Sequence, residues 1–456
     1  SMPGATLVNG QFEDAKDILL SFSRLQDTDP ESETYGRIPN RARPDDLIYN
    51  TTDGTPRFVI QAMDYVRYTG DTSIVDLLFP AIKRSIEGSL ARFTDDQGFL
   101  IHADADTWMD AKWEGKKPWS PRGNRANDIQ ALWIDQLKAG AWFAEAMGEN
   151  EQAEQWRSLA NRLINRFEDA FIIEGGGYLA DHLDEDGSQD RQFRPNQLFA
   201  LHHLGDKALK ARITRMSWSR LTYPWGVSSL DAGDPNFHPY HLAPEYYHKD
   251  AAYHNGAIWL WLNGIMMQRM IEFGQQDIAF ELFQNMNRLA LEDQGVGSMA
   301  ENADAIPKNG ADRGKTTGTF NQAWSSAEHL RVWYQHFLGF QPDLLHSKIH
   351  FEPHIPTKIR QLHTYFHHGK GKIDFSYVKG TEQSQYVLWN QSDENLHIAA
   401  SLPLFPNQDI ELGGDEQLKI IIKGEYAHWS KVDASGKEEK IASTPFDALK
   451  VVEQQE

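Results

Sequence analysis

The chain has 456 residues, of which 40% are hydrophobic, 11% aromatic and 24% charged, the composition of a folded globular protein. Its 65 acidic residues outnumber its 45 basic ones, and a net charge of −20 repels the phosphates of nucleic acids and anionic lipid, so we expect neither as a partner. The absence of cysteine excludes disulfides, thiolate nucleophiles and cysteine-ligated metals. The many aromatic rings favour a ligand with flat apolar faces, such as a sugar.

Five segments have the pattern of outer helices with one apolar face. In the first, residues 11–25, Phe12, Ala15, Ile18, Leu19 and Phe22 share one face, and charged residues occupy the other. The five predicted outer helices are 11–25, 72–94, 149–171, 206–221 and 275–292.

Five further segments are less charged and richer in aromatic residues, which is typical of helices buried on most sides. The predicted inner helices are 55–69, 126–146, 194–204, 250–271 and 320–338. Each has an Asn or Asp close to its start: Asp53, Asp128, Asn196, Asn255 and Asn321. These residues are candidate ligand contacts, although N-capping alone would also favour them.

The alternation of outer and inner helices predicts a mainly α fold, a six-hairpin (α/α)6 barrel over residues 1–340. Ten helices, beginning with an outer one, fall two short of six hairpins, so the barrel is entered partway round. The loops before the inner helices are long, polar and aromatic, and loops of this length in a compact domain are usually functional.

From residue 341 the pattern changes to short alternating strands separated by Gly, Asn and Asp. The predicted strands lie within 347–353, 359–368, 371–378, 384–390, 396–402 and 418–423. Residues 341–456 are therefore predicted to form a small antiparallel, β-sandwich-like domain.

Two acids in the long loops are candidates for catalysis. Asp110 lies among Trp108, Met109 and Trp113, where partial burial would raise its pKa and suit it to donate a proton. Glu301, flanked by small residues before the last inner helix, could activate water. From the residues alone, each could equally be an ordinary loop acid.

Several sequence blocks resemble the glucosidase domain of glycogen debranching enzymes. The matching blocks are GRIPNR (36–41), YNTTDGTPRF (49–58), TWMDAKW (107–113), SPRGN (120–124), IQALW (129–133), FRPNQLFAL (193–201), KDAAYHNGAIWLW (249–261) and FNQAWSSAEHLRVW (320–333). The resemblance covers residues 5–345 approximately. It implies an (α/α)6 barrel and the removal of single α-1,6-linked glucose units with inversion.

By this resemblance Asp110 matches the general acid and Glu301 the general base. Such a pair stands about 6.5–9.5 Å apart so that a water molecule fits beneath the anomeric carbon. Hydrogen bonds or ring contacts to glucose would come from residues at the mouths of the inner helices. These predicted substrate contacts are Asn50, Asp53, Trp108, Lys112, Arg122, Asp128, Arg194, Asn196, Trp225, His254, Asn255 and Trp324. Core packing remains the alternative for each tryptophan, and a structural role for His254.

The chain also departs from the family pattern. Asp128 stands where the family usually has Glu, which could loosen a sugar contact. A first inner helix with a Gly-Arg-Asp motif and an upstream β-rich domain are not present in this sequence. We therefore expect a partner chain or an N-terminal segment to complete the barrel.

No cofactor and no metal are expected. The run DHLDEDGSQD (181–190) lacks the ligand spacing of a calcium loop, and the histidines after residue 345 lack a zinc spacing. Neither a phosphate-binding glycine loop nor a serine nucleophile motif is present. Residues 5–25 carry no leader pattern, and we expect a cytoplasmic location.

Three alternatives remain beside the debranching-type glucosidase. The first is another inverting α-glycosidase on the same barrel, acting on small α-glucosides. The second is a sugar isomerase or epimerase, which would not need the two carboxyls. The third is a non-catalytic glucan-binding protein.

Overall fold

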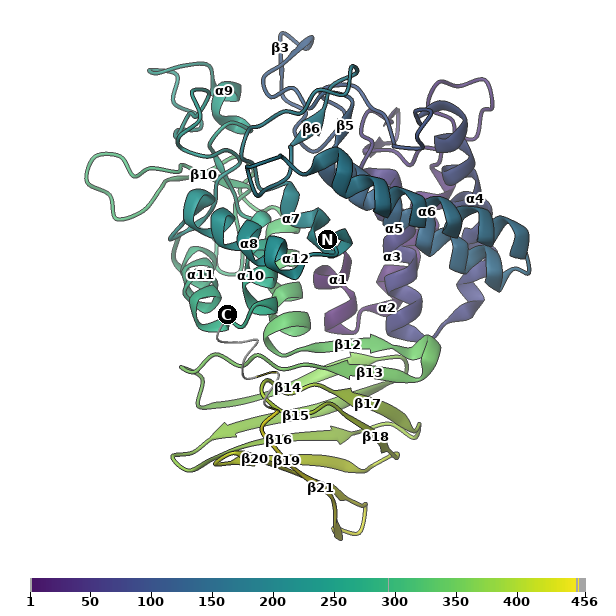
Figure 1. The fold of residues 1–456 in the computed structure, drawn as a ribbon, viewed down its shortest axis with the longest axis vertical. Helices are drawn as coiled ribbons and strands as arrows, with labels where there is room; N and C mark the ends of the chain where they lie inside the picture. The colour runs from purple at the N-terminus through teal and green to yellow at the C-terminus, as the bar shows by residue number, and fades with distance from the viewer. Residues whose placement is uncertain (1, 294, 448–449, 451–456) are drawn as a thin grey trace.

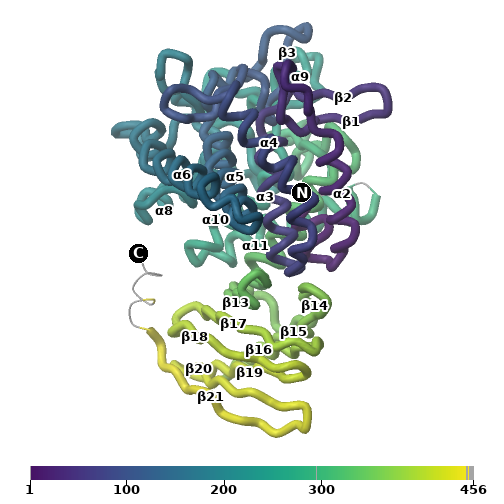
Figure 2. The backbone as a smooth tube through the Cα atoms, turned by 90° about the vertical axis from the view of Figure 1, so that its right-hand side faces the viewer, coloured from purple at the N-terminus to yellow at the C-terminus, as the bar shows by residue number. Residues whose placement is uncertain are grey.

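The computed structural model describes residues 2–293, 295–447 and 450. Helices fill the upper part of the molecule and two β-sheets lie below them (Figure 1). Figure 2, turned by 90°, shows the same separation. Within the described residues, no helix combines the length and hydropathy needed to span a bilayer.

The outer helices form where the amphipathic pattern predicts them. α6 shows the reason: Ala153, Trp156, Ala160, Leu163 and Phe167, three or four residues apart, are buried, and the charged residues between them face solvent. The outer helices are α2 (Phe12–Arg24), α4 (Val75–Arg92, preceded by a 3-10 turn at Thr72–Ile74), α6 (Asn150–Phe171), α8 (Lys207–Leu221) and α11 (Gln276–Arg288, continued by a π-helical turn at Leu289–Asp293).

The inner helices are buried on most sides. They are α3 (Gly54–Thr69), α5 (Asn127–Ala146), α7 (Gln197–Ala200, followed by a 3-10 turn at Leu201–His203), α10 (Leu262–Glu272) and α12 (Ala323–Val332, followed by a π-helical turn at Trp333–Phe337). Consecutive members contact one another, from α3 through α5, α7 and α10 to α12.

The short helix α1 (Met2–Ala5) lies between α12 and α3, the last and the first of the predicted inner helices. It therefore closes the ring of inner helices, of which the sequence pattern predicted only five members. Pro3 and Gly4 are buried there. A Cβ on Gly4 would stand 1.6 Å from the carbonyl oxygen of Ala327, so only glycine allows this approach. Two further residues, Leu7 and Val8 in the 3-10 turn Leu7–Asn9, join the core.

The prediction of one continuous helix over 250–271 was wrong. The chain instead forms α9 (Lys249–Tyr253), an irregular stretch with strand β9 (Ile258–Trp259), and then α10. Gly256 has φ +132°, and a Cβ there would stand 2.5 Å from the carbonyl oxygen of His238, so the helix cannot continue. The apolar residues of β9 pair with a strand from the Glu301 loop instead.

Short strands form hairpins and a small sheet above the inner helices. The pairs are β1 (Arg41–Arg43) with β2 (Asp46–Ile48), β3 (Lys112–Trp113) with β4 (Lys117–Pro118), β5 (Arg125–Ala126) with β6 (His182–Leu183), and β7 (Thr222–Tyr223) with β8 (Gly226–Val227). β9, β10 (Asn302–Ala303) and β11 (Thr316–Thr317) form an antiparallel three-stranded sheet. The pairs β1–β2, β3–β4 and β7–β8 are local hairpins, whereas β5–β6 and the pairing of β9 with β10 connect loops that are distant in sequence.

The C-terminal part contains two sheets around one hydrophobic core. The four-stranded sheet has the order β12 (Phe340–Asp343), β13 (Lys348–Phe351), β17 (Leu396–Ala400) and β18 (Gln408–Leu412). The six-stranded antiparallel sheet has the order β14 (Gln361–His368), β15 (Gly371–Lys379), β16 (Gln383–Asn390), β19 (Gln417–Lys423), β20 (Tyr426–Val432) and β21 (Glu438–Pro445). The inward residues of both sheets, such as Phe351 and Phe375, interdigitate.

One feature of this part departs from the expected antiparallel arrangement. β13 and β17 pair in parallel, with Ile349 opposite Ile398. Four strands of the C-terminal part were missed: β12, β18, β20 and β21. Polar residues dominate β18 and β21, the turns beside β18, β20 and β21 are short, and β12 has only four residues.

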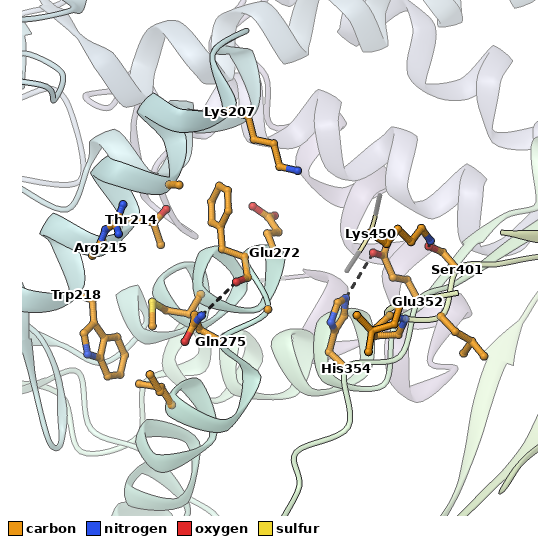
Figure 3. A pocket seen from close by; sticks show the side chains of 18 of the residues that line it. Lys207, Thr214, Arg215, Trp218, Glu272, Gln275, Glu352, His354, Ser401 and Lys450 are labelled. Carbon is orange, nitrogen blue, oxygen red and sulfur yellow. Dashed lines mark hydrogen bonds and ion pairs between the residues drawn. The ribbon is translucent and has the colours of Figure 1, made fainter. Parts of the chain in front are cut away.

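A cavity of about 540 Å³ separates the helices from the sheets on one side (Figure 3). Lys207 and Trp218 of α8 line one wall, Glu272 of α10 lies between, and Glu352 and His354 come from the chain after β13. A second cavity, of about 840 Å³, lies inside the ring of inner helices at its lower end, bounded below by β12 and β13. Neither contains Asp110 or Glu301.

Candidate active site

The predicted site residues gather at the end of the inner helices that is opposite to the sheets, where β3, α9 and β10 lie in Figure 1. Asp53 is the residue before α3, Asp128 is in the first turn of α5, and Asn196 precedes α7. Asp53 and Asn196 make no side-chain cap hydrogen bond, so capping does not explain their presence. The Asp53 carboxylate instead pairs with Arg57 at 3.5 Å, and the Asn196 side chain is buried and hydrogen-bonded within the protein.

Glu301 is held on both of its carboxylate oxygens. The Tyr253 hydroxyl donates to Oε1 at 2.9 Å, and the backbone N–H of Thr319 donates to Oε2 at 3.0 Å. The Glu301 side chain is 8% exposed, which leaves a narrow face open. Gly318, with φ +74°, lies against it, since a Cβ there would stand 2.5 Å from Oε2. The carboxylate therefore has one fixed orientation.

Asp110 lies at the solvent-facing mouth of the site, two residues before β3. Partial burial in the mouth raises the pKa of Asp110 to about 6, and the negative charges of Asp53 and Glu301 act in the same direction. Lys112 acts in the opposite direction. A carboxyl with this pKa holds its proton in about half of the molecules at pH 6 and in about a tenth at pH 7, against about one in a thousand for an unperturbed aspartic acid, so it can serve as a general acid.

Arg122 is the centre of a buried ion network beneath the mouth. Its guanidinium, which is 0% exposed, pairs with Asp128 at 2.7 Å and with Asp181 at 2.6 Å. Burial opposes ionisation of Asp181, but the Arg122 charge, the His182 hydrogen bond and the Arg194 charge together outweigh it and hold the pKa of Asp181 well below its usual range. The Asp128 carboxylate is thus paired with Arg122, and the residue is 2% exposed.

The network continues to the floor of the mouth. The Asn196 amide donates to Asp181 at 2.8 Å, and its carbonyl oxygen accepts from the Trp108 indole at 2.9 Å. Trp108, buried to 6% exposure, is thereby fixed in place two residues before Asp110.

A second set of hydrogen bonds anchors the loop that follows α9. Arg194 donates to the carbonyl oxygen of His254 at 2.6 Å and to the side-chain oxygen of Asn255 at 2.8 Å. Asn255 also accepts from the Ser120 hydroxyl at 2.8 Å and donates to the carbonyl oxygen of Trp119 at 3.1 Å. Arg194 and Asn255 therefore position backbone, and their polar groups are used within the protein.

His254 and four tryptophans form an aromatic floor. The His254 ring stacks on Trp259 at 5.1 Å and meets Trp108 edge-on at 5.4 Å, and Trp261 stacks on Trp324 at 5.5 Å. Burial holds the pKa of His254 well below its usual value, so the imidazole is neutral. Trp108 joins both pairs through edge contacts with Trp259 and Trp261.

Three of the predicted substrate contacts belong neither to the hydrogen-bond networks nor to the aromatic floor. Trp225 is 7% exposed, and its indole donates to the carbonyl oxygen of Asp304, so it packs under the loop after Glu301. Asn50 accepts a hydrogen bond from the Asn40 amide, beside the β1–β2 hairpin. Lys112 begins β3 and acts on Asp110 through its charge.

The sequence analysis missed Tyr253, Asp181 and Gly318. Tyr253 lies in the quoted block 249–261, but its partner Glu301 is 48 residues away, and no local pattern joins them. Asp181 begins the run 181–190, which was interpreted as a polar loop, although its side chain is buried against Arg122. A glycine beside a long polar loop gives no signal of a carboxylate contact.

Two groups of side chains within the described residues have the spacing of metal ligands. Asp181, His182 and Asp190 form one, but Asp181 is already paired with Arg122. The other joins Asp135 with two adjacent histidines, His202 at 2.9 Å and His203 at 3.2 Å, at the lower end of the ring. It lies away from the carboxyls at the mouth, on the far side of the inner helices.

Residues 1–331 match the family described as amylo-alpha-1,6-glucosidase. The chain belongs to this family. It is thereby a glycoside hydrolase, consistent with two carboxyl side chains at one mouth. The family match covers all of the predicted site residues.

A curated relative of this family member is the glycogen debranching enzyme of Saccharomyces cerevisiae. The two are 24% identical over an alignment of 369 residues, and the match covers 60% of this chain and 24% of the yeast enzyme. The chain thus spans about a quarter of the length of that relative.

Among solved structures, α-L-rhamnosidases share the fold. The GH78 rhamnosidase of Bacillus sp. GL1 has a TM-score of 0.58 at 15% identity, covering 86% of this chain and 38% of that one. The α-L-rhamnosidase of Dictyoglumus thermophilum has 0.59 at 14% identity, covering 93% and 46%. An uncharacterised conserved protein of Thermus thermophilus has 0.52 at 14% identity, covering 73% and 92%.

Proposed function

We propose that this family member releases glucose from α-1,6 branch points of glycogen-like glucans or oligosaccharides, with inversion at the anomeric carbon. The observation that carries the proposal is the pairing of two unlike carboxyls at one mouth. Asp110 is a solvent-facing acid with a pKa of about 6, and Glu301 is held by Tyr253 and Thr319. Different environments are how two carboxyls divide the roles of acid and base.

In the proposed reaction Asp110 gives its proton to the glycosidic oxygen as the bond from that oxygen to the anomeric carbon breaks. Glu301 takes a proton from a water molecule, whose oxygen attacks the anomeric carbon from the opposite face. The products are β-glucose and a glucan with a free hydroxyl. Asp110 is left as a carboxylate and Glu301 as a carboxylic acid, and exchange with solvent restores both.

The proposal extends to the architecture. The inner elements α1, α3, α5, α7, α10 and α12, with α2, α4, α6, α8 and α11 around them, would form an (α/α)6 barrel over residues 1–340. The contacts between consecutive inner helices and the place of α1 between α12 and α3 support this arrangement. The separate core of residues 338–429 supports a second domain over 341–456.

The test is proton NMR of the anomeric signals during incubation with a maltooligosaccharide that carries a single α-1,6-linked glucose. We expect β-glucose as the first product from the wild type. Asp110→Asn and Glu301→Gln should each lower kcat by several orders of magnitude without changing the circular dichroism spectrum. Initial release of α-glucose, or an active Glu301→Gln variant, would contradict the mechanism. Folded wild-type protein that binds the oligosaccharide without releasing glucose would favour the binding-only alternative.

A further inference from the structure

Three aromatic rings form a platform at the rim of the mouth, outside the predicted glucose contacts. Trp119 stacks on His248 with ring centroids 5.4 Å apart and an interplanar angle of 13°. Trp113 meets both rings edge-on, at 5.2 Å and 5.3 Å. Trp113 is 44% exposed, unusual for so large an apolar ring. We call Trp113, Trp119 and His248 the rim platform.

Hydrogen bonds connect the residues of the rim platform to the loops that carry the predicted site residues. The backbone N–H of Trp119 donates to the carbonyl oxygen of Ala111 at 3.0 Å, which closes the β3–β4 hairpin directly after Asp110. The carbonyl oxygen of Trp119 accepts from Asn255. His248 caps α9 by accepting from the backbone N–H of Asp250. The rings are therefore presented by fixed backbone, which lowers the entropy cost of using them to bind.

The rim platform is close along the chain to Asp110 and to Tyr253, the residue that holds Glu301. Trp113 follows Asp110 by three residues, a distance of roughly 10 Å along an extended chain. His248 is the N-cap residue of α9, and the last residue of that helix, Tyr253, holds Glu301. Two of the three rings, Trp113 and Trp119, belong to the β3–β4 hairpin and the residue after it, which directly follow Asp110, so the platform lies on the acid's side of the site.

In acid-assisted glycoside hydrolysis the acid stands next to the oxygen of the leaving group, so the leaving sugar chain lies on the acid's side. We propose that the rim platform binds the glucan chain that leaves with the proton of Asp110, and thereby selects a glucan over a small leaving group. This inference rests on the proposed function. The exposed Trp113 ring offers the flat apolar surface that a sugar ring covers.

Four other rings near the mouth are buried or have a cation over one face. Trp108 and Trp259 are buried in the aromatic floor. Tyr240 and Tyr246, on the opposite loop, already have the Lys308 ammonium over their faces at 4.3 Å and 4.9 Å.

The test compares two substrates with the same glucose but different leaving groups. One is the maltooligosaccharide with a single α-1,6-linked glucose, and the other is methyl α-glucoside, whose methanol leaving group has no sugar but still needs the proton of Asp110. Trp113→Ala should lower kcat/KM for the oligosaccharide by about tenfold or more, the usual effect of removing a central aromatic contact. It should leave kcat/KM for the methyl glucoside unchanged. Trp113→Phe should restore part of the loss.

The matched control is Tyr426→Ala, which removes a ring of 49% exposure from β20, at the opposite end of the molecule (Figure 1). We expect wild-type constants for both substrates. An equal loss for the two substrates in Trp113→Ala would overturn the inference, because it would mean that the ring supports the carboxyls rather than the leaving chain.

Titration calorimetry with unbranched maltooligosaccharides tests the rim platform without turnover. Weaker binding by Trp113→Ala than by the wild type would support it, and equal affinities would overturn it. If the wild type hydrolyses neither substrate but still binds maltooligosaccharides more tightly than Trp113→Ala does, the proposed hydrolysis is wrong, while glucan binding by the rim platform is supported.

Discussion

The hydroxyl of Tyr253 lies 2.9 Å from Oε1 of Glu301 and donates a hydrogen bond to it. Tyr253 is the last residue of α9, while Glu301 precedes β10, so the contact joins two elements that the sequence separates by 48 residues. The nearby negative charge and burial together raise the pKa of Tyr253, which keeps its hydroxyl protonated as a donor. Tyr253 is therefore a positioning residue for the predicted base.

Tyr253→Phe removes this donor and keeps the ring, which packs on His241 and Trp259. Because a hydrogen bond to a charged group contributes about 1.5–3 kcal/mol, we expect kcat to fall by roughly 10- to 150-fold with little change in KM. The measurement is a set of initial rates against substrate concentration. Tyr178→Phe, which loses a hydroxyl donated to the carbonyl oxygen of Arg191, is the control. Equal kcat values for the wild type and Tyr253→Phe would remove Tyr253 from the site.

The pH dependence of kcat/KM should report the proton on Asp110. Because Asp110 acts as the acid, the active form is lost as pH rises through its pKa of about 6. Asp53→Asn removes a nearby negative charge, which lowers that pKa, so the basic limb should move to lower pH. Lys112→Met removes a nearby positive charge and should move the limb to higher pH.

These two variants change neighbouring charges in opposite directions, so each controls for the other. The comparison uses the pH at which kcat/KM falls on the basic side. Both residues are also predicted to contact substrate, so either substitution could change the absolute value of kcat/KM. If kcat/KM fell at the same pH in both variants as in the wild type, a group other than Asp110 would be responsible for the fall.

Gly318 should be required for the orientation of Glu301. An alanine Cβ at this position would stand 2.5 Å from Glu301 Oε2 and 2.6 Å from Asn302 Oδ1, so one of the groups must move. We expect Gly318→Ala to lower kcat by at least tenfold, since small displacements of a reacting group are costly. Gly310→Ala is a matched control: φ is +73° there against +74°, and no atom lies within 4 Å of its Cβ.

Both glycine variants carry the same backbone cost of about 1–2 kcal/mol for a left-handed residue. Thermal unfolding measures that shared cost, and activity measures the difference. If both variants lose kcat equally, the effect comes from the loop backbone and not from contact with the carboxylate.

Amphipathic periodicity was enough to predict the outer helices within a few residues, because one apolar face per helix suffices to identify them. α6, for example, is Asn150–Phe171 against a prediction of 149–171. The break at 254–261 was not predictable in this way, since an apolar stretch has the same pattern in a buried helix and in a buried strand. Its conformation depends on pairing with β10, which is about 40 residues away.

The candidate site was predicted through motif resemblance, and the residues around it only in part. Asp110, Asp53 and Glu301 interact through their charges, as a shared site requires. The roles of Asp181, Tyr253 and Trp225 depend on contacts between loops far apart in sequence, for which a single sequence has no periodic signal.

Arg122→Met should destabilise the protein strongly, because it leaves Asp128 and Asp181 buried without their cation. Breaking a buried pair on one side costs about 3–5 kcal/mol. A carboxyl whose folded-state pKa is depressed stabilises the fold above its unfolded pKa and loses this contribution as pH falls. Since Asp181 is such a group and its unfolded pKa is about 3.9, the deficit of the variant relative to the wild type should be full at pH 7 and should shrink only as the pH falls below about 4, for example at about pH 3.

The matched control for this prediction is Arg157→Met on α6. Arg157 pairs with Glu145 at 2.7 Å, but both side chains are largely exposed, at 43% and 58%. An exposed pair contributes about 0–1 kcal/mol, so the thermal midpoint of this variant should stay close to that of the wild type at both pH values. If Arg122→Met and Arg157→Met unfolded at the same temperature, the Arg122 pairs would add no stability, and the network beneath the mouth would not be what holds Asn196 and Trp108 in position.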